Sequence, residues 1–107
     1  MRVLLDNCVP WRLGQHITGH SVDSAMRWGW AALDDGPLLD AMAGSFDVLV
    51  TVDKSIPHQQ RIDTRPVAVV LLRATSNHIG ALLPLMPALL AALDDVNPGE
   101  FLEIGSP

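Results

Sequence analysis

The chain has 107 residues, a formal net charge of −5 and 49% apolar residues, which suits one domain over residues 1–107 with a hydrophobic core of its own. The single Cys8 excludes an internal disulfide, and the longest uncharged apolar stretch, 79–93, is too short to span a membrane. The acidic charge argues against a broad basic clamp for nucleic acid, although a cation-binding carboxylate cluster also makes a chain acidic. With no visible signal peptide, we expect a soluble cytoplasmic protein without membrane contact.

Short apolar runs alternate with helical segments along the chain. Runs of apolar and β-branched residues, each bounded by turn residues, predict strands. In chain order these strands cover 3–5, about 21–25, 47–52, 66–72 and 100–104. The first run, Val3-Leu4-Leu5, and the fourth, PVAVVLL, lack polar alternation, which is typical of parallel strands that are buried on both faces.

The segments between these strands predict helices. They cover 10–16, 34–44 and 78–93, with a loop or short helix at 54–61. The first has Trp11, Leu13 and Ile17 as its apolar positions, and Asp34 or Asp35 caps the second.

The last predicted helix, capped by Ser76 or Asn77, contains two prolines that kink or split it. Its apolar residues recur at helical spacing around more than half of its girth. Such a helix is either buried or at a subunit contact, and we lean towards a homodimer.

This order of elements predicts an α/β fold: a three-layer α/β/α sandwich with a mostly parallel central sheet of about five strands and right-handed crossovers. Ligands of such sheets bind beyond the carboxyl ends of the strands. That rule directs attention to Asp6-Asn7, Asp53-Lys54 and Arg73, which follow or end three of the predicted strands.

Asp6 and Asp53 are the strongest candidates for chemistry. If their strands are neighbours, the two carboxylates lie side by side and repel each other, and a divalent cation relieves that repulsion. Mg²⁺ and Mn²⁺ prefer oxygen ligands, and water held by such an ion can attack a phosphodiester. Alternatively, each aspartate only caps a turn or helix, which is also the simplest interpretation of Asp35.

Other side chains near the same rim could bind a substrate. Lys54 and Arg73 could hold phosphates, or could instead pair with aspartates. Trp28 and Trp30 share one loop, where they could stack on RNA bases, anchor a protein partner or pack on the core.

Four motifs follow one another along the chain: LLDNCVP at 4–10, GH at 19–20, DGPLL at 35–39 and FDVLVTVDKS at 46–55. In this order they resemble the small PIN-like domains related to VapC-type toxin ribonucleases, and the similarity covers nearly the whole chain. The resemblance implies an RNA-cleaving hydrolase that depends on Mg²⁺ or Mn²⁺, with Asp6, Asp35 and Asp53 as its metal-binding and catalytic acids. It also implies the toxin half of a toxin–antitoxin pair, with an RNA substrate and a small antitoxin protein as partners.

Two departures from the family pattern leave alternatives open. Asn7 and Ser55 stand where many relatives carry acidic residues. One alternative is therefore a catalytically degenerate module that acts by binding protein or RNA. Another is a receiver-like phosphoacceptor using Asp53, although Lys54 adjoins this aspartate instead of following a later strand.

Overall fold

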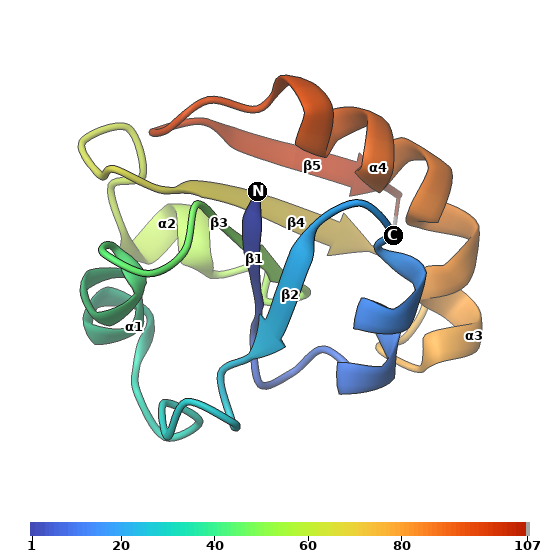
Figure 1. Ribbon diagram of the computed structural model, residues 1–107, viewed down its shortest axis with the longest axis horizontal. Helices are drawn as coiled ribbons and strands as arrows, with labels where there is room; N and C mark the ends of the chain where they lie inside the picture. Colours follow the sequence, from blue (N-terminus) through green and yellow to red (C-terminus); the bar gives the residue numbers. More distant parts are fainter. Residues whose placement is uncertain (107) are drawn as a thin grey trace.

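A computed structural model describes residues 1–106 and contains one five-stranded sheet with the order β2-β1-β3-β4-β5 (Figure 1). The strands are β1 (Arg2–Leu5), β2 (Ser21–Ser24), β3 (Val48–Thr51), β4 (Ala68–Arg73) and β5 (Phe101–Gly105). Every neighbouring pair is parallel. The predicted α/β class is confirmed, and the sheet is wholly parallel.

Six short helices connect the strands. They are the 3₁₀ helix η1 (Trp11–His16), α1 (Asp35–Met42), α2 (Ile56–Gln59), α3 (Ile79–Leu82), the 3₁₀ helix η2 (Leu83–Leu85) and α4 (Met86–Asp95). The predicted helix over 78–93 is thus split into three pieces, with a proline in the first turn of both η2 and α4. Its capping prediction was wrong, because His78 holds the N-cap position without a side-chain bond, while Ser76 Oγ accepts the His78 N–H at 3.3 Å.

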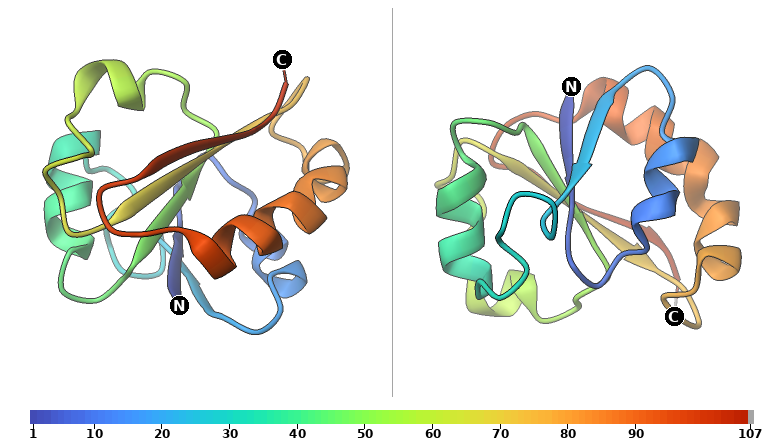
Figure 2. Two further views of the ribbon diagram at one scale, coloured as in Figure 1. Left: turned by 90° about the horizontal axis from the view of Figure 1, so that it is seen from above. Right: turned by 60° about the horizontal axis from the view of Figure 1, so that its bottom comes forward.

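Alternation along the strands divides the core into two halves (Figure 2). On β1, Val3 and Leu5 face one side, where the core is completed by η1, α3 and α4. Leu4 faces the other side, where α1 and α2 cover the sheet. Helices therefore lie on both faces, which gives the three-layer sandwich predicted above.

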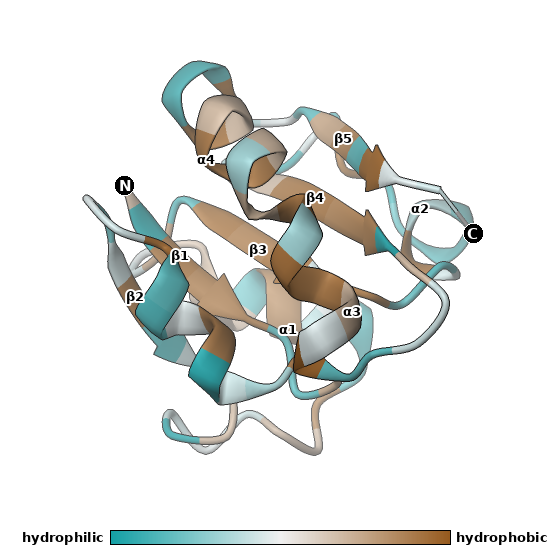
Figure 3. Cartoon of the chain, turned by 90° about the vertical axis from the view of Figure 1, so that its right-hand side faces the viewer, coloured by the Kyte–Doolittle hydropathy of each residue, from teal (hydrophilic) through white to brown (hydrophobic). Residues whose placement is uncertain are grey.

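Helix α4 uses its apolar stripe within its own domain. Its residues Met86, Leu89 and Leu93 are buried in the same cluster as the sheet, together with Leu82 of α3, and Leu90 is partly buried on that cluster. Figure 3 shows this helix lying beside the mostly brown strand β4. Packing within the chain accounts for the leucine-rich pattern that suggested a dimer contact.

The four crossovers do not all have the same hand. The chain passes from β1 to β2 and from β4 to β5 on the η1 face, but it steps in opposite directions along the sheet. Between these steps, α1 and α2 cross on the opposite face. The last crossover thus has the hand opposite to the first three, so the expectation of uniformly right-handed crossovers was wrong. The six-residue η1 covers only a small part of the sheet face on which it lies. Helices α3 and α4 cover the rest of that face, which requires the last connection to cross on the same side as η1.

The strand order reverses direction between β1 and β3. The connection after β1 leads to β2 on one side, whereas the connection after β2 returns past β1 to β3. Such a switch point opens a crevice at the carboxyl ends of the two strands. The fold therefore places the segments after Leu5 and after Thr51 at the position where doubly wound sheets bind ligands. No helix within residues 1–106 is long and apolar enough to cross a bilayer.

Candidate functional site

Asp6 lies at the switch point because β1 and β3 are paired in register. Leu5 lies opposite Val50, and the Asp6 N–H continues the ladder by donating to the Val50 carbonyl at 2.9 Å. This bond fixes the Asp6 backbone beside Thr51, the last residue of β3. The Asp6 carboxylate accepts the N–H of Asn7 at 2.8 Å, so one of its oxygens is also held by its own turn.

Thr51 joins the two acidic segments. Its hydroxyl donates to Asp6 Oδ2 at 2.7 Å and accepts the Asp53 N–H at 3.1 Å. Thr51 is fully buried, and it is the one polar residue in the buried core of residues 1–106. A buried hydroxyl with both its donor and its acceptor capacity in use sets the position of both aspartates.

Asp53 is held by Ser55, which lies two residues further along the chain. Asp53 Oδ1 accepts the Ser55 hydroxyl at 2.6 Å and the Ser55 N–H at 2.9 Å. These hydrogen bonds lower the pKa of Asp53, and a hydrogen bond with the Asp35 carboxyl lowers it further. Ser55 therefore keeps Asp53 ionised and oriented.

Asp35 reaches the same place from the opposite face of the sheet, at the first residue of α1. Burial raises the pKa of Asp35, and the negative charges of Asp53 and Asp6 raise it further. The structure thus brings the three predicted acids together closely enough for their charges to interact. Asp35, whose pKa is raised, therefore takes up a proton more readily than Asp53, whose pKa is lowered.

The three carboxylates do not form a ready-made cage. Within residues 1–106, no three His, Cys, Asp or Glu side chains converge closely enough to enclose a metal ion. Asp6 is turned towards Thr51, which leaves the facing pair Asp35 and Asp53. Mg²⁺ is commonly held by one or two carboxylates and several waters, and this all-oxygen donor set fits that mode of binding.

Cys8 lies beside the same carboxylate. Its Sγ is 3.6 Å from Asp6 Oδ2, and burial raises the pKa of the Cys8 thiol, with the charge of Asp6 acting in the same direction. A thiol with a raised pKa is a poor nucleophile. Cys8 therefore contributes a weak hydrogen bond to Asp6.

The predicted substrate-binding residues lie in three different settings. Lys54 is exposed and lines a hollow of about 190 Å³ next to Asp53. Arg73 ends β4 and pairs with Glu103 of β5 at 3.3 Å, which ties its guanidinium to the neighbouring strand. Trp30 is half-buried and packs against Trp28 and Phe46, with ring centroids 5.2 Å and 6.0 Å apart. Of the three, only Lys54 adjoins the carboxylates in sequence and remains exposed.

The Gly-His pair of the second motif lies at the other end of the sheet. Gly19 has a φ of 85° in the turn before β2, and His20 Nδ1 is 3.1 Å from the amino terminus. This pair shapes the entry into β2 and does not face the acids.

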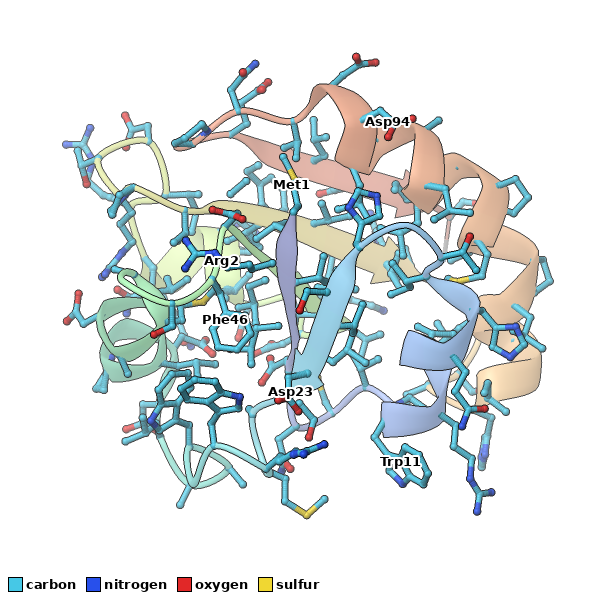
Figure 4. All side chains as sticks on the ribbon, viewed as in Figure 1. Met1, Arg2, Trp11, Asp23, Phe46 and Asp94 are labelled. Carbon is cyan, nitrogen blue, oxygen red and sulfur yellow. The ribbon has the colours of Figure 1, made fainter. Side chains whose placement is uncertain are left out.

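Sequence reasoning missed two residues around the site. Thr51 lies in the strand predicted over 47–52 and in the FDVLVTVDKS motif but was given no role of its own, although a lone hydroxyl in a buried aliphatic strand is itself a signal. Trp11 was assigned to the apolar side of a helix, yet it is 55% exposed. Trp11 and Asp6 both line a hollow of about 390 Å³ at the carboxyl end of the sheet. Figure 4 shows the indole of Trp11 projecting from η1 at this end.

Comparison of the chain with family models, with curated proteins and with solved structures gives no match in any of the three. The geometry of the site, and not a relative, must carry any functional assignment.

Proposed function

We propose that this protein is a divalent-metal-dependent endoribonuclease, and that it acts as the toxin component of a toxin–antitoxin pair. The observation that carries the proposal is the coupling of three carboxylates from three segments at the switch point of the sheet. Burial raises the pKa of Asp35, and the charges of Asp53 and Asp6 raise it further. Such mutual repulsion is the electrostatic condition that a cation relieves.

Asp35 and Asp53 would hold Mg²⁺ or Mn²⁺, with Asp6 interacting directly or through water. The bound ion would lower the pKa of a water molecule and neutralise charge on the phosphoryl oxygens of RNA. Thr51 fixes Asp6 and the backbone of Asp53, while Ser55 orients the Asp53 carboxylate. These residues would keep the acidic oxygens in place while the substrate binds.

Lys54 would contribute a positive charge at the rim. Its side chain is exposed beside Asp53, where an ammonium group could hold a phosphate of the RNA backbone. Arg73 would have to break its ion pair with Glu103 to bind a phosphate, so we expect it to contribute less than Lys54 to RNA binding. An RNA substrate and an antitoxin protein would place this activity in the cytoplasm.

The test is cleavage of a mixed-sequence single-stranded RNA with Mn²⁺, by the wild type and by variants that remove one charge each. Asp6→Asn and Asp53→Asn should lose cleavage, whereas Asp94→Asn should retain it. Asp94 is an exposed aspartate on α4 that Figure 4 places on the far side of the molecule from Trp11. Equal cleavage by all three variants would refute the assignment of the acids, and no cleavage by the wild type would refute the nuclease.

A second candidate function is supported by the hydrogen bonding of Asp6. This carboxylate already accepts bonds from Thr51, Asn7 and Cys8, and no set of three ligands surrounds an ion within residues 1–106. A module that binds RNA or protein without cutting would have such an arrangement. Calorimetric titration with Mn²⁺ separates the two functions, because binding that Asp53→Asn abolishes would contradict the non-catalytic module.

A further inference from the structure

The seven Lys and Arg residues of the chain divide into two groups. Five are ion-paired with carboxylates: Arg2, Arg27, Arg61, Arg65 and Arg73. Within residues 1–106, Arg12 and Lys54 make no such pair, and both are exposed. These two cations follow the turns after β1 and β3, so they flank the switch point that carries Asp6 and Asp53. Two exposed cations in the connections after β1 and β3 could each bind one phosphate group of a ligand that carries several phosphates.

Trp11 lines three hollows, two of which it shares with residues of the proposed site. On one side it shares the hollow of about 390 Å³ with Asp6, and on the other it shares a hollow of about 430 Å³ with Arg12 and His78. Its indole is not packed into either half of the core, and the Arg12 guanidinium lies 5.3 Å from the ring centroid. A tryptophan with open space beside it and a cation on its ring can accept a stacked base.

The hollow beside Asp6 has apolar surface that could contact the face of a nucleobase and polar groups that could hydrogen-bond to its edge. Met26, which is 61% exposed, lines it as a second apolar surface, while Asn7 and Asn77 offer amide donors and acceptors. Asn77 Nδ2 donates to the Cys8 carbonyl at 3.3 Å, so the loop after β4 closes over the loop after β1.

The hollow beside Asp6 adjoins the Lys54 hollow, because Asn77 lines both. A chain that enters at Trp11 therefore passes Asp6 and then Asn77 before it reaches Lys54. A stacking face and a cation thus lie along two adjoining hollows, with the Asp6 carboxylate between them in this lining.

We propose that the hollow between Trp11 and Asp6 is a nucleobase subsite for single-stranded RNA, with the base stacked on Trp11 and the backbone held between Arg12 and Lys54. This inference rests on the proposed ribonuclease function and adds a base-binding subsite, which requires a single strand because bases within a duplex cannot reach a stacking face. A protein segment is the less suited occupant, since carboxylate and amide groups interrupt the apolar surface of this hollow.

Binding can be measured without cleavage. The Asp53→Asn background, in chelator and at low salt, is titrated into a fluorescein-labelled eight-nucleotide RNA while fluorescence anisotropy is recorded. Trp11→Ala should weaken binding by about 5- to 150-fold, the range found for loss of one stacked base. Trp11→Phe should recover most of the affinity. Arg12→Ala and Lys54→Ala should each reduce the slope of log K against log salt by about 0.7.

Trp28→Ala is the matched control, because it removes another exposed tryptophan, one that does not line this hollow. It should bind as the background does. If it fails to fold by circular dichroism, Leu33→Ala replaces it as the loss of an exposed apolar side chain.

Unchanged affinity in Trp11→Ala overturns the subsite, as does equal competition by duplex RNA. Self-association that depends on Trp11, without RNA binding, identifies the hollow as a protein contact and also overturns it. If RNA binding depends on Trp11 but the wild type does not cleave with Mn²⁺, the subsite stands and the nuclease fails.

Discussion

The Thr51 hydroxyl and the Asp6 carboxylate lie 2.7 Å apart and connect the carboxyl ends of two inner strands. The same hydroxyl accepts the N–H of Asp53, so a single oxygen atom determines how the two acidic segments sit relative to each other. Nothing else in the interior of the sheet is polar within residues 1–106, which makes this contact easy to isolate experimentally.

Thr51→Val keeps the shape of the side chain but removes the hydroxyl. We expect it to lower the free energy of unfolding by about 1–3 kcal/mol, because a charged acceptor and a backbone donor both lose their partner. Thr51→Ser, which retains the hydroxyl and loses one methyl group, should cost about 1 kcal/mol. Urea unfolding at neutral pH measures both variants. A valine variant as stable as the wild type would mean that water replaces the hydroxyl.

Asp35→Asn should change stability in a manner that depends on pH. The folded pKa of Asp35 lies above its unfolded value, so its stabilising contribution is present below the unfolded pKa and is lost as the pH rises through the folded pKa. At pH 7 the ionised wild-type side chain repels Asp53 and Asp6, whereas asparagine carries no charge. The variant should therefore be the more stable protein at pH 7, and the difference should shrink as the pH falls towards about 4.

Urea midpoints recorded across this pH range test the prediction for Asp35, with Asp94→Asn as the control for loss of one charge. A difference between Asp35→Asn and the wild type that stays constant with pH would contradict a folded pKa of Asp35 above its unfolded value.

If Mn²⁺ binds at the carboxylates as proposed, it should stabilise the folded protein, because a ligand that binds only the native state shifts the unfolding equilibrium. At a free concentration of about 100 times the dissociation constant, the gain is about 2.7 kcal/mol. Asp6→Asn and Asp53→Asn should lose most of this gain, and Asp94→Asn should keep it. Thermal unfolding with Mn²⁺ and again after EDTA provides the measurement. A melting temperature that does not respond to the ion in the wild type contradicts a metal site at this place.

Leu89→Ala tests whether α4 belongs to the core. Leu89 is fully buried on the sheet, so its truncation should cost about 2–5 kcal/mol of unfolding free energy. Leu90, its partly buried neighbour, provides the comparison, and Leu90→Ala should cost clearly less. Similar losses in the two variants would place the helix differently from the arrangement described above.

Sequence reasoning located Asp6 and Asp53 because parallel strands end on the same side of a sheet, so residues after two such strands converge. Asp35 came from the family resemblance, since a helix N-cap region looks alike whether or not it faces a site. The five strands were recognisable because short runs of apolar and β-branched residues, such as Val48–Thr51, are typical of strands buried on both faces.

Other features depend on contacts that no local pattern encodes. Trp11 falls on the exposed side because η1 is a 3₁₀ helix, with three residues per turn, and of its six residues only Leu13 is buried. The pairing of Arg73 with Glu103 requires the register between β4 and β5. The hand of the last crossover depends on which face of the sheet the other helices leave uncovered. That face is determined by the whole chain and not by the local sequence.

The placement of the acids on β1 and β3 has a consequence for how the protein could diversify. Both strands have neighbours on either side, so the backbone that carries Asp6 and Thr51 is anchored independently of the sheet's open borders. The loop 26–34 is mostly exposed, so insertions there could change what the molecule binds without altering the pairing of these strands. The loop 7–10 is different, because the Asn7 N–H bonds to the Asp6 carboxylate and the Val9 N–H bonds to the Asp6 carbonyl.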